Sequence, residues 1–165
     1  MNNDCLAFFL TWTTYGTFLP GDLRGWTKWH KGEQQPQPLL NDWCKEQMTG
    51  AEVRLSSAQR RIVEEVIGEH CRHRGWILHG VNCRSNHCHV VVAAIEHSGD
   101  QVRDQLKAWA TRRLNDDVRS KRQHATQRWW TRKGSVRHLY EENALDLAIE
   151  YTLEAQELGG SKLGM

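Results

Sequence analysis

Short hydrophobic segments divide this chain into candidate strands. Residues 5–13 (CLAFFLTWT) are apolar and aromatic and end at a glycine-containing turn, which is typical of a buried strand. Residues 76–82 and 87–94 are also rich in strand-forming side chains. The turn residues 84–86 lie between these two segments, so the pattern predicts an antiparallel hairpin.

Three further segments have the apolar spacing of amphipathic helices. The first begins at Ser56 or Ser57, either of which can cap a helix, and ends at Gly75. The second runs from about Gly99 to Leu114, where Asn115 and Asp116 follow. The third lies within residues 141–158, with its apolar stripe between Asn143 and Gln156.

The order of these elements predicts an α+β fold, a ferredoxin-like sandwich with a central antiparallel sheet. Residues 129–139 supply a fourth strand or a small hairpin, because the Lys133-Gly134 turn lies between strand-like flanks. Residues 16–55 contain several prolines and glycines with little periodicity, which indicates a long inserted loop or arm after the first strand. We expect residues 1–165 to form a single domain, since this length suits one core.

The composition of the chain indicates the cellular compartment in which we expect the protein. No apolar stretch approaches the roughly 20 residues that cross a bilayer, and residues 1–4 lack the features of a signal peptide. We therefore expect a cytoplasmic protein with no membrane partner. The five cysteines, an odd number without Cys-x-x-Cys spacing, favour a reducing compartment. A zinc site using Cys83, His87, Cys88 and His89 is disfavoured because these ligands are crowded in sequence.

The positive charge is unevenly distributed. Residues 101–140 hold eleven of the 22 Lys and Arg residues against three acids, and tryptophans are interleaved with them. Aromatic faces beside cations are suited to single-stranded nucleic acid, although a solvated helix face is the alternative. A second candidate surface is the loop bearing Arg24 and Trp26, whose tryptophans could instead pack on the core. The candidates in the basic region are Lys107, Arg112, Arg113, Arg119, Arg122, Trp129, Trp130, Arg132, Lys133 and Arg137.

Two histidines open the run of β-formers at residues 87–94. Alternation along a strand places His87 and His89 on one face, with their positions about 6 to 7 Å apart. Two neutral imidazoles at this spacing can form one side of a divalent-metal site. The alternative is an ordinary pair of strand histidines.

Tyrosine is the candidate nucleophile. A tyrosine that attacks a phosphodiester conserves the bond as a phosphotyrosine, so the strand can be rejoined without an external energy source. The chain offers Tyr15, Tyr140 and Tyr151. For Tyr151 the alternative is a half-buried structural tyrosine with its hydroxyl at the rim of the core.

Four blocks of sequence resemble a known family. Residues 86–92 (NHCHVVV) are similar to the His-hydrophobe-His motif of the HUH endonucleases, with Cys88 in the middle position. Residues 149–156 look like the tyrosine-bearing helix of single-tyrosine HUH transposases. Residues 9–26 and 130–137 resemble two blocks of the REP-associated tyrosine transposases, and the ordered set covers most of the chain.

The resemblance implies roles for individual residues. It assigns Tyr151 as the nucleophile on a carboxy-terminal helix, with Tyr140 as the alternative, and His87 and His89 as ligands of Mg²⁺ or Mn²⁺. In several such transposases a glutamine four residues after the tyrosine completes the metal site. Ala155 has that spacing here, so the third ligand is either Gln156 or Glu154.

The resulting hypothesis is a metal-dependent single-strand DNA endonuclease and strand transferase. It would act on hairpin-forming repeat DNA through a 5′-phosphotyrosine intermediate, with single-stranded or hairpin DNA as its partner and a homodimer as a possible assembly. Two alternatives stay open: an insertion-sequence transposase that mobilises its own element, and a non-catalytic ferredoxin-like nucleic-acid-binding protein.

Overall fold

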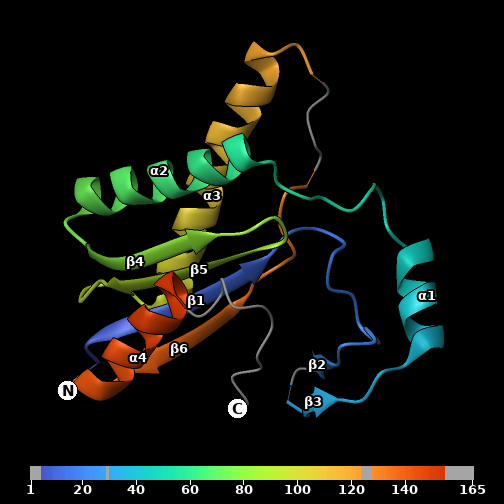
Figure 1. Ribbon diagram of the computed structural model, residues 1–165, viewed down its shortest axis with the longest axis horizontal. Helices are drawn as coiled ribbons and strands as arrows, with labels where there is room; N and C mark the ends of the chain where they lie inside the picture. The colour runs from blue at the N-terminus through green and yellow to red at the C-terminus, as the bar shows by residue number, and fades with distance from the viewer. Residues whose placement is uncertain (1–4, 29, 124–127, 155–165) are drawn as a thin grey trace.

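A four-stranded antiparallel sheet organises the protein. The computed structural model describes residues 5–28, 30–123 and 128–154, and the strand order in its main sheet is β4-β5-β1-β6. Helices α2 and α3 cover one face of this sheet and α4 covers the other (Figure 1). The bounds are β1 Ala7–Thr13, α2 Ser57–Arg74, β4 Ile77–Cys83, β5 His87–Ala93, α3 Gly99–Ser120, β6 Ser135–Leu139 and α4 Glu142–Leu153. The predicted ferredoxin-like α+β sandwich is confirmed.

Capping residues set the ends of α2 and the start of α3. Ser56 and Gln59 form a capping box at α2, while Gly75 ends that helix in the left-handed conformation that glycine adopts readily. An equivalent box formed by Ser98 and Gln101 begins α3. The predicted end of α3 at Leu114 is wrong: the helix continues to Ser120, because buried Val118 extends its apolar stripe by one more turn.

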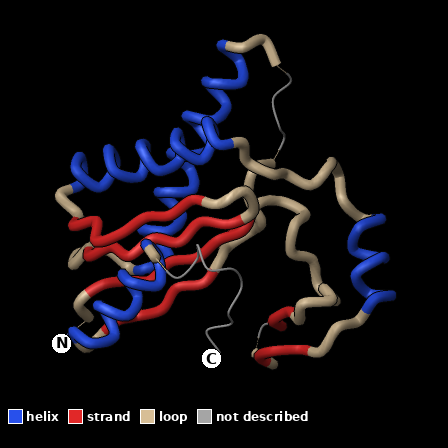
Figure 2. The backbone as a smooth tube through the Cα atoms, viewed as in Figure 1, coloured by secondary structure: helices blue, strands red, loops and turns tan. Residues whose placement is uncertain are grey.

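Residues 16–55 form the predicted arm, and the arm has secondary structure of its own. Figures 1 and 2 show it extending from one end of the main sheet. It contains β2 (Trp26–Lys28), β3 (Gly32–Gln34) and α1 (Pro38–Glu46). The arm is attached to the sheet by backbone hydrogen bonds from Val53 to Tyr15 and from Leu55 to Ser85. The two short strands were not predicted, because strands of this length depend on each other for pairing.

Alternating side chains of β1 separate two apolar clusters. Phe8, Leu10 and Trp12 point toward α2 and α3 and are nearly inaccessible to solvent. Ala7 and Phe9 point the other way and pack beneath α4. The larger cluster therefore lies between the sheet and the two long helices. No helix in the described ranges is long and apolar enough to span a membrane.

Trp129 and Trp130 belong to the larger cluster, where they retain 3% and 6% of their exposure. The Trp129 indole donates a 2.7 Å hydrogen bond to Asn115, and the Trp130 ring meets Trp12 edge-on. The prediction that these two tryptophans stack on DNA bases is therefore wrong. Their apolar rings fill the core, although the sequence around them is basic.

We expect Trp130→Ala to lower the free energy of unfolding by about 3 to 5 kcal/mol, because the substitution leaves a cavity in the core. Urea unfolding monitored by circular dichroism measures the change. Trp43→Ala is the matched control, since Trp43 is 57% exposed on α1 and its replacement should stay within about 0.5 kcal/mol of the parent. Equal losses in the two variants would contradict the burial described for Trp130.

Candidate functional site

The histidine pair lies at the start of β5, on the sheet face that α4 covers in part. In the register of β1 and β5, His89 is opposite Thr11 and His87 is opposite Thr13. The two imidazole centroids are 4.8 Å apart. His89 is buried and His87 is half-buried. Both rings therefore lie on one face of the strand, as the alternation predicted.

Both imidazoles are oriented through Nδ1. Thr11 Oγ1 lies 2.8 Å from Nδ1 of His89, and Asn86 Oδ1 lies 2.7 Å from Nδ1 of His87. When each Nδ1–H donates to its oxygen partner, the lone pair of each ring is on Nε2, the tautomer that suits metal ligation. Burial, together with the nearby charges of His87 and Arg84, lowers the pKa of His89 to about 3. His89 is therefore neutral near pH 7, as a ligand must be.

Tyr151 on α4 joins the pair. Its ring centroid is 5.5 Å from that of His89 and 6.1 Å from that of Phe9, both in edge-on contacts. Asn82 on β4 donates a 2.9 Å hydrogen bond to the carbonyl oxygen of Thr152, which fixes the last turn of α4 above the sheet. The aromatic cluster formed by His89, Phe9 and Tyr151 thus combines residues far apart in sequence.

The other two tyrosines lie elsewhere. Tyr140 is 58% exposed and stacks on His138, whose ring contacts Phe8 on the opposite face of the sheet. Tyr15 lies at the base of the arm, where its hydroxyl accepts a hydrogen bond from the Thr49 amide. The Thr49 hydroxyl, and then this amide, lower the pKa of Tyr15, but its position is outside the histidine cluster.

The third metal ligand is not placed by the structure. No group of three or more His, Cys, Asp or Glu side chains suited to a metal occurs in the part of the chain that is described. Glu154, exposed just after α4, is therefore not gathered with the pair, and Gln156 lies outside the described residues. The donor set present is two imidazoles, which fits half of a divalent-metal site and favours Mn²⁺ over Mg²⁺.

The zinc alternative is not supported by the direction of the thiols. Cys83 and Cys88 are opposite each other in the β4–β5 hairpin and are buried against α2 and α3. The histidines point to the other face. Burial raises the pKa of Cys88 well above its ordinary value, so its sulfur stays a neutral thiol.

Several predicted DNA-binding cations are already engaged within the protein. Arg24 forms an ion pair with Asp22, and Trp26 donates to the carbonyl oxygen of Gln35. On α3, Arg112 lies over the ring of Trp109. Arg113 of α3 forms an ion pair with Glu69 of α2, and Arg119 forms one with Asp116 within α3. Arg122, at the end of α3, is exposed.

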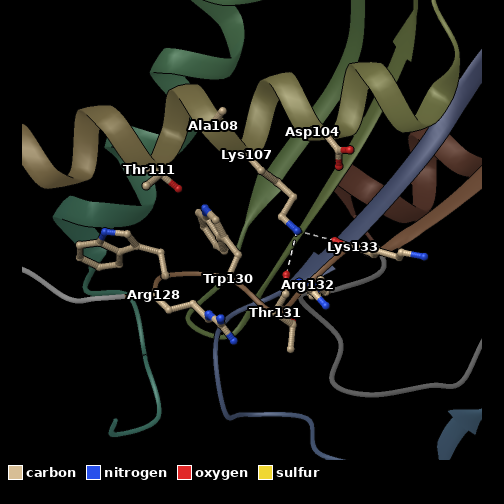
Figure 3. Close-up of a pocket in the computed structure, with 10 residues that line it drawn as sticks. Asp104, Lys107, Ala108, Thr111, Arg128, Trp130, Thr131, Arg132 and Lys133 are labelled. Atoms are coloured by element: carbon tan, nitrogen blue, oxygen red, sulfur yellow. Dashed lines mark hydrogen bonds between the residues drawn. The ribbon is translucent and has the colours of Figure 1, made fainter. Parts of the chain in front are cut away.

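Lys107 has a structural role at a pocket beside α3. Figure 3 shows its ammonium group donating to the carbonyl oxygens of Thr131 and Lys133. Burial and the neighbouring Arg103 lower its pKa to about 8. Arg103, which the sequence did not single out, is itself buried and donates to the carbonyl oxygen of Gly134. The two cations thus fix the loop before β6 instead of facing solvent.

Arg132 and Lys133, within this anchored loop, and Arg137, on β6, are exposed. Hydrogen bonding connects this segment to the candidate site, because Thr131 bonds to Thr13 and Thr13 is opposite His87. Sequence reasoning missed Thr11 and Asn82. A signal for them exists only in the strand pairing, which places both directly opposite His89.

Comparison with known proteins adds a likeness in fold. No family model matches this chain, and no curated protein matches it at a significant level. One similar solved structure is a protein from Deinococcus radiodurans R1 that is described provisionally as a transposase. The two chains are 14% identical, the match covers 87% of this chain and 85% of the other, and the TM-score is 0.48. A likeness of this size identifies neither the family nor the activity.

We expect Thr11→Val to weaken Mn²⁺ binding by about 10- to 100-fold, because it removes the oxygen that orients His89. Electron paramagnetic resonance of free Mn²⁺ measures the affinity. Thr13→Val is the control, since Thr13 is on the same strand and face but its hydroxyl bonds to the hydroxyl of Thr131 instead. An unchanged affinity in Thr11→Val would show that this contact does not serve a metal.

Proposed function

We propose that this protein is a metal-dependent single-strand DNA endonuclease and strand transferase of the tyrosine HUH type, a transposase acting on hairpin-forming repeat DNA. The observation that carries the proposal is the 5.5 Å contact between the rings of Tyr151 and His89, beside His87. A potential nucleophile from α4 and two imidazoles from β5 meet there. This is the constellation that phosphotyrosine chemistry requires.

The proposed reaction is an in-line displacement at phosphorus. The phenol oxygen of Tyr151 forms a bond to the scissile phosphorus while the bond from phosphorus to the 3′ oxygen breaks. The phenol proton is released, and the leaving 3′ oxygen takes up a proton to become a hydroxyl. The product is a 5′-phosphotyrosine, from which an incoming 3′ hydroxyl regenerates a phosphodiester and free Tyr151 in the reverse sense.

The chain's own residues would position these groups. A divalent ion, when bound, would polarise the scissile phosphate and offset the charge that develops on it. His87 and His89 would hold that ion through Nε2, with Asn86 and Thr11 fixing the ring orientations. Asn82 would hold the end of α4, and with it Tyr151, over the same row of the sheet.

A non-catalytic nucleic-acid-binding protein is the second candidate. It is favoured by one observation: within the described ranges, no acidic side chain completes a three-ligand cluster with the histidines. An insertion-sequence transposase would share the chemistry proposed above and differ in its DNA. The homodimer stays a prediction, as does the choice between Gln156 and Glu154.

We expect Tyr151→Phe to abolish the covalent protein–DNA adduct while DNA affinity stays within a few-fold of the parent, because the substitution removes only the nucleophilic oxygen. The adduct is measured by denaturing electrophoresis after incubation with labelled hairpin DNA and Mn²⁺. Tyr140→Phe is the matched control and should form the adduct normally. Adduct that persists in Tyr151→Phe but is lost in Tyr140→Phe would reassign the nucleophile.

His87→Ala and His89→Ala should each remove metal-dependent cleavage without unfolding the protein, because either substitution leaves a single imidazole. Thermal unfolding by circular dichroism checks the fold, and cleavage is titrated against Mn²⁺ concentration. Cleavage at the parental rate in either variant would return the pair to an ordinary structural role. Absence of adduct and of cleavage in the parent protein on every hairpin tested would favour the non-catalytic candidate.

A further inference from the structure

Helix α4 crosses the sheet obliquely and leaves one corner of its face open. Midway along the helix, Ala148 packs with Ala7 and Leu139, which belong to β1 and β6. Near its end, Thr152 accepts a hydrogen bond from Asn82 of β4. Figure 1 shows this diagonal course from β6 toward β4. At the level of the histidines, the helix thus covers the β4 side of the sheet face and leaves the β1 and β6 side uncovered.

The uncovered corner lies in the same rows as the candidate site. Ser135 of β6 is opposite Thr11, and Arg137 is opposite Phe9, so all four side chains point to the α4 face. Thr11 and Phe9 in turn contact His89. Two strand spacings, about 9.6 Å in total, separate β6 from β5. The edge strand β6 therefore lies close enough to the proposed reaction centre to meet a phosphate that neighbours the scissile one.

The chemistry of this corner suits a phosphate. Arg137 and Ser135 are exposed, and Arg137 forms no ion pair with another described residue, unlike Arg103, Arg113 or Arg119. Beside it, the carbonyl oxygens of Thr131 and Gly134 are directed toward Lys107 and Arg103 of α3, away from the α4 face. The corner therefore presents a guanidinium and hydroxyl groups, which are common phosphate partners.

We propose that the corner formed by Thr11, Ser135 and Arg137, beside the covered Phe9, binds a phosphodiester of single-stranded DNA next to the scissile one. The inference rests on the proposed function and adds a direction to it. The strand leaves Tyr151 across β1 and β6, because the end of α4 occupies the way across β4. Arg137 bonds the phosphate oxygens, and Ser135 donates from its hydroxyl beside it.

The test is a salt titration of binding to a mixed-sequence single-stranded oligonucleotide, followed by fluorescence anisotropy. Arg137→Ala should reduce the slope of log affinity against log salt by up to about 0.7, the value for one lost phosphate contact on a single strand. Arg137→Lys should retain the slope because the charge is kept. Arg61→Ala is the control, since Arg61 is exposed on α2 at the other face of the sheet, and it should leave the slope unchanged.

The outcomes separate this inference from the proposed function. A parental slope in Arg137→Ala, or an equal drop in Arg61→Ala, overturns the corner even if Tyr151 forms an adduct. A selective drop in Arg137→Ala supports the corner even if no adduct forms, in which case the nuclease proposal alone fails. Failure of the parent protein to bind single strands overturns the corner as well. Thermal unfolding confirms that each variant is folded.

Discussion

The pairing register of β1 against β5 is the constraint on which the rest of the structure depends. It places Thr11 opposite His89 and Trp12 opposite Cys88, so that one face carries the imidazoles and the other carries the core. A slip of one residue would turn Val90 and Val92 toward α4 and the histidines toward α2 and α3. Burial of Leu10, Trp12 and Val90 makes that slip costly, and the hydrophobic core thereby fixes the geometry of the polar site.

Much of the fold could be predicted because its signals are local. Alternation identified the strands, and the Ser56 cap and Gly75 identified α2. The fates of Trp129 and Trp130 were not predictable in this way, since a basic sequence context does not say whether a ring meets solvent or Trp12. The arm's short strands likewise stabilise one another only once the chain has folded back on itself.

The candidate site shows the same division. The His87 and His89 alternation is a property of one strand, whereas the contacts of His89 with Thr11 and Tyr151 join segments 78 and 62 residues away. Asn82 is the clearest case: nothing in its sequence neighbourhood indicates that it holds the helix bearing Tyr151. The family resemblance could indicate Tyr151 as a candidate, but only the folded sheet shows which side chains it contacts.

The position of Cys88 has a consequence for which ions the site can hold. A sulfur atom between two imidazoles in sequence would make a soft ligand set, and soft sets capture zinc and copper in preference to harder ions. The pleat of β5 sends this thiol into the core, on the opposite side from both rings, and the apolar surroundings keep it protonated. In the proposed metal site, strand geometry would therefore act as a filter on metal identity, excluding the one side chain in the motif that would attract a competing ion.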